Sequence, residues 1–456
     1  MNAKPYPKYK ASGVEWLGEV PEHWEASPLK RKVQIINGGT PSSSDSESWD
    51  GEIEWFTPQD MGQNVGKVID SSRRKITEDG FANCGVTIAP AGSILISTRA
   101  PIGHVAITGV DSCCNQGCRL IVPRSPELFR SYGYYVILAS KGVLQTAGKG
   151  TTFLELSGGA LGMHAIPMPP ILEQQAIADF LDDHTTKLDA LVEKKRALIG
   201  KLKEKRSALI SRTVTKGLPP EAAAKAGLNP KPKLKSSGIP WLGDIPEHWE
   251  LSQFRRKISE LDQGWSPNAN NYPADANELG VLKLGAARQG RFQPEENKAL
   301  DEIPDGVKVI TPRTGDILLS RSNTPELVGD VGLVTANFSN LIIPDLIYRL
   351  RLNFGMSSSF VCWFLLSRSC RAQIEGDARG SSSSMVKLGQ GHVRAWTIPL
   401  PSLFEQETIS TFLDQATSKI DRMIQKVETA IEKLTEYRTA LITAAVTGKI
   451  DVRKPR

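Results

Sequence analysis

One long stretch occurs twice in this chain, and it constrains the fold more than any other feature. Residues 166–217 read IPMPPILEQQAIADFLDDHTTKLDALVEKKRALIGKLKEKRSALISRTVTKG, and residues 398–449 align with them without a gap. Each copy opens with a proline-rich turn and then continues without proline to a closing pair of Gly and Lys. Since proline is excluded from helix interiors and glycine commonly ends a helix, each copy predicts one long helix.

Apolar residues recur in both copies at alternating steps of four and three residues. This average period of 3.5 keeps one stripe of a helix against a partner helix, as in a coiled coil. In the first copy the stripe is interrupted by His184, Lys195 and Lys205, although lysine stems can lie along such a stripe with the ammonium in water. We therefore expect the two helices to pack against each other as an antiparallel coiled coil. The predicted seam consists of Ile177, Leu181, Leu188, Leu191, Leu198, Leu202, Leu209, Ile409, Leu413, Ile420, Met423, Val427, Leu434 and Leu441.

A second repeat precedes each globular segment. Residues 12–25 read SGVEWLGEVPEHWE and residues 237–250 read SGIPWLGDIPEHWE. The tryptophans are large amphipathic anchors, whereas His23 and His248 have no further His, Cys or acidic residue at metal-ligand spacing. We call each copy a clasp and expect it to serve as a docking element.

The chain is therefore predicted to repeat one unit of clasp, variable globular segment and long helix, with internal pseudo-two-fold symmetry. Strands are expected in both segments, and GSILIS at 92–97 matches GDILLS at 315–320, whereas the loops of the two segments do not match. The expected fold class is α+β, with two β-rich α/β domains separated by the two long helices. The expected boundaries are 1–165 for the first domain with its clasp, 166–216 for the first long helix, 217–236 for a linker, 237–397 for the second domain with its clasp, 398–449 for the second long helix and 450–456 for a basic tail.

Composition places the chain in a broad class. The 456 residues carry a net charge of +6 with a pI of about 8.9, which permits a polyanionic partner without requiring one. There is no long apolar run of membrane-spanning length and no apolar segment at the N-terminus that resembles a secretory signal, so we expect a cytoplasmic protein. The six cysteines imply no disulfide framework in a chain of this length.

Catalytic motifs were sought and are missing from the sequence. A methyltransferase needs a glycine-rich cofactor loop and an Asn- or Asp-Pro-Pro-aromatic motif, and the nearest string, MPPIL at Met168, has neither the polar residue nor the aromatic one. Cys113, Cys114 and Cys118 have no second Cys or His pair nearby that would favour zinc. We expect a non-catalytic chain without metal or cofactor of its own.

Polar and basic loops favour a DNA-binding function. Arg, Lys, Asn, Ser and Thr are the residue types that bond phosphates and base edges, and here they gather in loops of both globular segments. Any single one of them is more simply a solvated loop residue. The candidate DNA-binding residues are Arg73, Arg74, Lys75, Arg99, Lys149, Thr151, Thr152, Arg288, Arg291, Arg321, Asn323, Arg379 and Ser381.

The motifs INGGTPS, WDGEIEWFTPQDM, GSILISTRAPIGHVAI, CCNQGCRL, IPMPPILEQQAIADFLD and IPLPSLFEQETISTFLD together resemble the specificity subunit of type I restriction-modification systems. The resemblance covers nearly the whole chain, and the doubled Pro-x-Pro-x-x-x-Glu-Gln at the head of a long helix is its most specific part. It implies two target recognition domains, each of which reads one half of a split DNA target, and helices that set the spacer and dock the methyltransferase subunits. It also implies a subunit without catalytic activity.

The resemblance further implies the partners. They are double-stranded DNA, two modification subunits that bind S-adenosylmethionine and methylate adenine, and restriction subunits in the full complex, with no membrane involved. Two other classes stay open on the residues alone. One is a coiled-coil scaffold whose globular ends bind protein, and the other is a fused type II enzyme that carries methylation or cleavage on the same chain.

Overall fold

The computed structural model describes residues 4–64, 66–99, 101–124, 127–149, 154–275, 277–304, 306–307, 309–382 and 385–453. The chain divides into two compact units. The first unit is Met1–Lys195 with Thr429–Arg456, and the second is Arg196–Glu428. Each unit therefore contains one globular part and a portion of both long helices.

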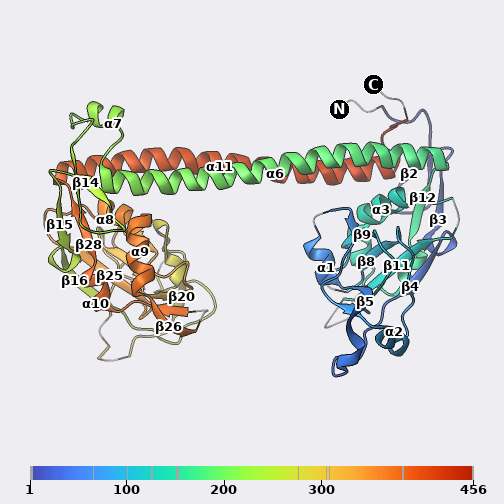
Figure 1. The fold of residues 1–456 in the computed structure, drawn as a ribbon, viewed down its shortest axis with the longest axis horizontal. Helices are drawn as coiled ribbons and strands as arrows, with labels where there is room; N and C mark the ends of the chain where they lie inside the picture. Colours follow the sequence, from blue (N-terminus) through green and yellow to red (C-terminus); the bar gives the residue numbers. More distant parts are fainter. Residues whose placement is uncertain are drawn as a thin grey trace. The chain divides into compact units, whose positions relative to one another are not determined.

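The two repeated stretches form the long helices α6, Ile171–Lys216, and α11, Leu403–Val446, and each runs without a break (Figure 1). Both begin later than the expected boundaries at 166 and 398. The intervening residues form short strands, β12 (Ala165–Met168) and β28 (Thr397–Leu400), followed by the prolines. Since proline lacks the N–H that a helix interior needs, the helices start beyond them.

The predicted seam is wrong at three of its residues. Leu191, Leu198 and Met423 are 42%, 44% and 53% exposed. The half-buried positions of α6 lie one residue further on, at Val192 and Ile199. The stripe thus has the expected average period but a different order of steps.

Two buried threonines explain why the predicted order of four-residue and three-residue steps along the stripe was wrong. Thr185 and Thr417 are only 4% and 3% exposed, and each hydroxyl donates a 2.7 Å hydrogen bond to the backbone carbonyl four residues earlier in its own helix. A hydroxyl satisfied in this way can be buried at low cost. A strict alternation of steps of four and three residues places His184 and Ala416 on the stripe and passes over both threonines.

The main sheet of the first unit has five strands in the order β4-β11-β8-β9-β6, with neighbours antiparallel except for β6 and β9, which are parallel. A second sheet, β10-β5-β7, lies in the same unit. The strands of both sheets are β4 (Val33–Asn37), β5 (Trp49–Phe56), β6 (Val68–Ile69), β7 (Lys75–Ile76), β8 (Ile94–Ser97), β9 (Val105–Thr108), β10 (Ser112–Cys114) and β11 (Cys118–Pro123). Helix α3 (Arg130–Ala139) contacts strands β8 and β9.

The main sheet of the second unit has the order β16-β25-β21-β23-β19-β18, and β19 and β23 are its one parallel pair among the described residues. A three-stranded sheet, β20-β17-β24, accompanies it. The strands are β16 (Ile258–Gln263), β17 (Leu279–Leu282), β18 (Ala287–Arg288), β19 (Gly290–Phe292), β20 (Asn297–Leu300), β21 (Ile317–Ser320), β23 (Val331–Leu333), β24 (Leu341–Ile342) and β25 (Ile347–Leu352). Helices α8 (Ser358–Leu365) and α9 (Arg368–Asp377) follow.

The two globular parts share one strand plan. The order β4-β11-β8-β9-β6 corresponds strand for strand to β16-β25-β21-β23-β19, including the single parallel pair at the end. The matching strings GSILIS and GDILLS contain β8 and β21, which sit at the same place in the two sheets. The expectation of a shared fold, based on those strings, is confirmed.

The stretch 217–236, expected as an exposed linker, is partly ordered into the second unit. It contains helix α7 (Pro220–Lys225) and strand β13 (Leu234–Ser236), which pairs with β14 (Asp244–Pro246). Ala223 is 3% exposed and belongs to the core of this unit. Apolar alanines in a helical turn therefore pack where composition alone suggested a spacer.

The two kinds of sequence repeat meet in the structure. In the first unit, the indole N–H of Trp24 in the clasp donates to Glu173 at the start of α6 over 3.1 Å, and His23 Nε2 lies 2.8 Å from the same carboxylate. Trp24 is fully buried in the core of its unit. The neighbouring Gln174 accepts from the backbone N–H of Phe129, which precedes α3.

The second clasp makes the same contacts. Trp249 donates to Glu405 over 3.0 Å and His248 Nε2 lies 3.1 Å from Glu405, while Gln406 accepts from the backbone N–H of Ser357, which precedes α8. Trp249 is also fully buried. The Glu-Gln pair of each long helix therefore joins it to the clasp and to the globular part of its own unit.

Candidate nucleic-acid interface

The candidate residues of the first unit that follow β6 have different partners. The guanidinium of Arg74 stacks 3.7 Å above the ring of Trp49, and the Lys75 ammonium lies 2.8 Å from the Glu54 carboxylate. The hydrogen bond from Lys75 to Glu54 raises the pKa of the lysine. Arg73 is exposed. The guanidinium of Arg74 is held in place by the ring of Trp49. The side chain of Arg73 is exposed to solvent, where it can contact a phosphate.

A polar hollow of about 550 Å³ lies beside the ends of β4 and β8. Arg99, one of the candidates, donates from Nε to Glu155 over 3.0 Å, and Arg119 on β11 lies 3.8 Å from the other oxygen of that carboxylate. Arg119 also donates to Asn37, and burial lowers the pKa of its guanidinium. Two guanidinium groups share one carboxylate, so the hollow carries an excess of positive charge.

The remaining candidates of the first unit are close in sequence to Glu155, which lines this hollow. Lys149 is exposed and forms an isolated antiparallel bridge with Glu155. Thr151 and Thr152 lie outside the described residues. Arg119 and Gln116, which both line the hollow, were missed by the sequence analysis. The available signal was the expected strand CRLIV, because Arg119 lies within it and Gln116 lies two residues before it.

In the second unit, Arg321 follows β21 at the place where Thr98 and Arg99 follow β8 in the first. Its guanidinium donates to the backbone oxygen of Asp345 over 3.2 Å and lies 5.7 Å from the ring centre of Tyr348. Asn323 is in the short strand β22 (Ser322–Asn323), which pairs with β27 (Met385–Lys387).

The other candidates of this unit are spread over three further strands. Arg288, in β18, is exposed, and Arg291, in β19, has a side chain that is 72% exposed. Arg379 and Ser381 belong to β26 (Arg379–Ser382), and their side chains are outside the described ones. The DNA-binding role of all these residues stays a prediction.

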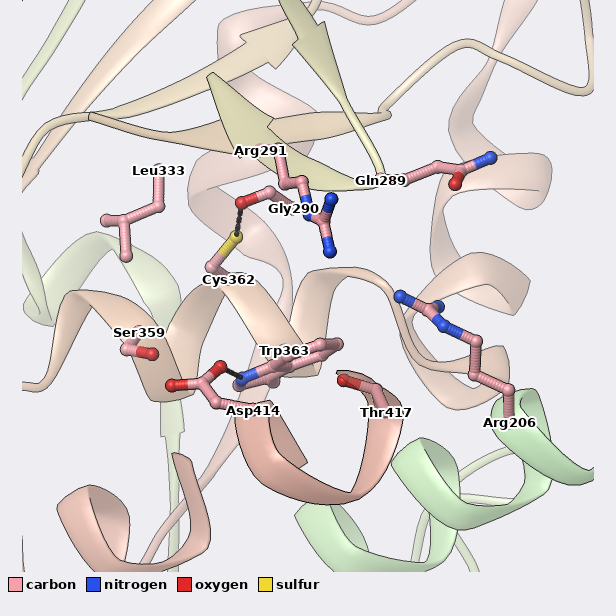
Figure 2. Close-up of a pocket in the computed structure, with 10 residues that line it drawn as sticks. All are labelled: Arg206, Gln289, Gly290, Arg291, Leu333, Ser359, Cys362, Trp363, Asp414 and Thr417. Atoms are coloured by element: carbon pink, nitrogen blue, oxygen red, sulfur yellow. Dashed lines mark hydrogen bonds between the residues drawn. The ribbon is translucent and has the colours of Figure 1, made fainter. Parts of the chain in front are cut away.

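A cavity of about 190 Å³ lies between β19, α8 and α11 (Figure 2). On one side the indole N–H of Trp363 donates to Asp414 over 3.0 Å. Burial raises the pKa of Asp414, and the bond from Trp363 opposes that rise. On the other side the guanidinium of Arg206 donates to Asp421 over 2.9 Å, and that of Arg291 lies 3.8 Å from the same carboxylate. The residues around this cavity therefore join the globular part of the second unit to both long helices.

The first unit has an equivalent contact between a long helix and the helix that follows the sheet. Tyr135 of α3 donates to Asp182 of α6 over 2.6 Å, as Trp363 donates to Asp414 in the second unit. The ammonium of Lys67 bonds the same Asp182 and lies 4.7 Å from the Tyr135 ring centre. Both units therefore tie an aspartate of a long helix to an aromatic donor of the helix that follows the sheet.

The described part of the chain offers neither a metal site nor a membrane-spanning helix. Among the residues that the structure describes, no three His, Cys, Asp or Glu side chains are grouped so that they could hold a metal ion. In the same part of the chain, no helix combines the length and apolar character that crossing a bilayer requires. The geometry instead offers exposed cations, amides and hydroxyls at loop ends, which are groups that bond polyanions and base edges.

Comparison with known proteins agrees with this chemistry. Residues 21–201 match the family described as the type I restriction modification DNA specificity domain. A type I restriction enzyme specificity subunit of Methanocaldococcus jannaschii, MjaIX, is 36% identical over 182 residues, 40% of this chain and 41% of that protein. The EcoKI specificity subunit of Escherichia coli K12 is 21% identical over 450 residues, 95% of this chain and 90% of that protein.

The more similar relatives are matched over less than half of their length: the match covers 41% of MjaIX and 44% of the EcoR124I/EcoR124II specificity subunit of Escherichia coli. A solved structure described as the basis of complex assembly and conformational transition of the type I restriction-modification system superposes with a TM-score of 0.65. It is 16% identical in sequence and covers 94% of this chain and 99% of its own. That likeness concerns the fold.

Proposed function

We propose that this chain, which belongs to the family of type I restriction-modification specificity subunits, is the sequence-specific DNA-recognition subunit of a type I restriction-modification complex. The observation that carries the proposal is the doubled strand plan with unlike loops. The two sheets have corresponding strand orders, whereas the loops that leave them differ in length and chemistry. Each domain thus serves as a target recognition domain that reads one half of a bipartite target, because sequence is read by side chains at groove edges and not by the scaffold.

We further propose that α6 and α11 pair as an antiparallel coiled coil with a pseudo-two-fold axis. Asp189 of α6 accepts from Arg438 of α11 over 2.9 Å in the first unit, and Arg206 of α6 donates to Asp421 of α11 over 2.9 Å in the second. The separation of Asp189 and Arg206 along α6 equals that of Asp421 and Arg438 along α11. Equal separations with opposite order are what an antiparallel pair in one register requires, and such a pair sets the spacer between the two half-sites.

The helix ends support the same symmetry. Gly448, after α11, lies against Trp24 of the first clasp, and Gly217, after α6, lies against Trp249 of the second. The tryptophan of each clasp thus contacts the glutamate at the start of one long helix and the glycine after the end of the other. A two-fold relation exchanges these contacts.

The partners in this proposal are double-stranded DNA, two modification subunits docked on the helices, and restriction subunits in the full complex. The chain itself neither transfers methyl groups nor cuts DNA, and S-adenosylmethionine binds the modification subunits. The absence of a methyltransferase motif from the sequence supports this division of labour.

The test uses the full chain, alone and assembled with its modification subunits. With the modification subunits and labelled S-adenosylmethionine, we expect adenine methylation at a bipartite sequence and retardation of DNA that carries it. The chain alone should transfer no label. Binding to protein partners without any sequence-specific retardation would favour the scaffold alternative, and methyl transfer by the chain alone would favour a fused enzyme.

A further inference from the structure

The two recognition domains present one residue at the same place, two positions before β11 in the first unit and two positions before β25 in the second. In the first unit the N–H of Thr98, after β8, donates to Gly117 O over 2.7 Å, and in the second the N–H of Arg321, after β21, donates to Leu346 O over 2.8 Å. Gly117 precedes β11 and Leu346 precedes β25. The residues one step earlier, Gln116 and Asp345, therefore occupy equivalent positions.

In each unit, the loop that follows the first strand of the main sheet also contacts this position. Thr40, after β4, donates its hydroxyl to Gln116 Oε1, and Ser266, after β16, donates its hydroxyl to Asp345 Oδ1. The backbones of the two loops touch so closely that a Cβ at Gly38 would lie 1.8 Å from Asn115 O. The equivalent position in the second unit is also a glycine with no room for a side chain. The fold thus fixes where the Gln116 and Asp345 backbones stand.

An unsatisfied arginine accompanies each of these residues. Among the described residues, Arg119 Nε and Arg321 Nε are buried and have no hydrogen-bond partner. Their side chains are only 11% and 24% exposed. A buried N–H without a partner is uncommon in native proteins, and in both domains one belongs to an arginine beside this position.

The side chains at this position differ in what they can bond. Gln116 is exposed and offers an amide with two donors and one acceptor group, whereas the Asp345 carboxylate, 41% exposed, only accepts. In the major groove, an amide forms two bonds with the N6 and N7 of adenine, and a carboxylate accepts from the N4 amino group of cytosine. One scaffold position therefore carries two different base preferences.

We propose that Gln116 and Asp345 are base-reading residues of the two recognition domains, Gln116 for an adenine in one half of the target and Asp345 for a cytosine in the other. This assignment rests on the proposed function and adds to it the residues and the bases. Neither residue was among the candidates from sequence, because neither lies in one of the polar or basic loops from which those candidates were taken.

The experiment maps the methylated sequence of the chain assembled with its modification subunits, for the wild type and for the nearly isosteric variants Gln116→Glu and Asp345→Asn. We expect each variant to relax or change one base in one half-site and to leave the other half-site and the spacer unchanged. Gln34→Glu, on the exposed face of β4, is the matched control and should leave both half-sites unchanged.

A second measurement on the wild-type complex removes any dependence on the folding of the variants. Replacing the recognised adenine by 7-deazaadenine removes N7, and replacing the recognised cytosine by a 2-pyrimidinone nucleotide removes the N4 amino group. Each should weaken DNA binding in the retardation assay roughly 5- to 150-fold. This range corresponds to the discrimination of about 1–3 kcal/mol that a good base contact provides. The Gln116→Glu complex should not respond to the 7-deaza substitution.

The outcomes separate the two levels of the proposal. If the wild-type complex shows no bipartite methylation, the proposed function fails. If it does, but both variants keep the wild-type sequence or no base analogue weakens binding, the assignment of Gln116 and Asp345 is overturned.

Discussion

Glu173 and Glu405 are equivalent residues, but different numbers of groups contact them in the two clasps. Glu173 accepts from Trp24 and from the Tyr6 hydroxyl over 2.6 Å, lies 2.8 Å from His23, and has the Arg453 guanidinium 3.8 Å away. Burial and the bond to Glu173 raise the pKa of Tyr6.

In the second clasp, the described side chains that contact the Glu405 carboxylate are those of Trp249 and His248. The additional groups of the first clasp come from the two ends of the chain, and Asp451 N donates to Lys4 O over 2.9 Å beside them. The comparison teaches that the Trp-His-Glu contact is the shared element that positions a long helix. The extra contacts secure the chain ends.

If the shared contact positions both helices, removing its tryptophan should cost the most and should cost both units alike. Trp24→Ala and Trp249→Ala each delete a fully buried indole, so we expect a loss of about 3–5 kcal/mol in the unfolding free energy. Hydrogen exchange followed by mass spectrometry would locate the loss in the unit of the substituted tryptophan. A small or delocalised effect would contradict the role of the clasp.

The next prediction concerns pH, because the equivalent residues His164 and Trp396 differ. Burial lowers the pKa of His164 to about 4, and its Nε2 lies 2.8 Å from the Ser140 hydroxyl. The unfolded state, with a histidine pKa of about 6.5, binds the proton more readily than the folded state. The first unit should therefore have its full stability above about pH 6.5 and lose up to about 3 kcal/mol as the pH falls to about 4.

Hydrogen exchange across this pH range is the measurement. His164→Gln should remove most of the pH dependence of the first unit, and the second unit, with Trp396 at this place, should not share it. Equal acid sensitivity of both units in the wild type would argue against a His164 origin.

The revised stripe of the long helices can be tested with two adjacent residues of the second unit. Ile424 is half-buried and Met423 is 53% exposed. Ile424→Lys should lower the unfolding free energy by about 2 kcal/mol, because it replaces partly buried apolar surface with a charge. Met423→Lys should change it by less than about 0.5 kcal/mol, as surface substitutions usually do. The reverse ranking would restore the seam predicted from the sequence.

The smallest expected effect separates the two glutamates. Glu173→Gln should destabilise the chain by about 1 kcal/mol more than Glu405→Gln, because Glu173 has the additional bond from Tyr6 and the nearby Arg453. Chemical denaturation of the two variants would measure the difference. Equal losses would mean that the chain ends add nothing to the first clasp.

The sequence predicted the two long helices and the shared plan of the two sheets well, because both depend on short-range patterns that occur twice in the chain. Prolines before Ile171 and Leu403, the apolar period and the closing glycines determine the long helices. The strings GSILIS and GDILLS predicted two sheets of one plan, which the strand order confirms.

The sequence did not predict the contacts that depend on distant parts of the chain. Nothing near Glu173 in the sequence indicates Tyr6 or Trp24 as partners, and the meeting of Gln116 with Thr40 requires the pairing of β4 with β11. The choice of polar and basic loops also left out the short segment before β11 that contains Gln116. The equivalence of Gln116 and Asp345 depends on the strand order of the two sheets, which the sequence alone does not give.

The central claim is that two recognition domains on one frame read two half-sites independently. Its most direct test is to exchange residues 38–159 for the equivalent segment of a relative and to map the methylated adenines produced with the modification subunits. We predict a new sequence in one half-site, with the other half-site and the spacer unchanged. A change in both half-sites, or in the spacer alone, would contradict the account.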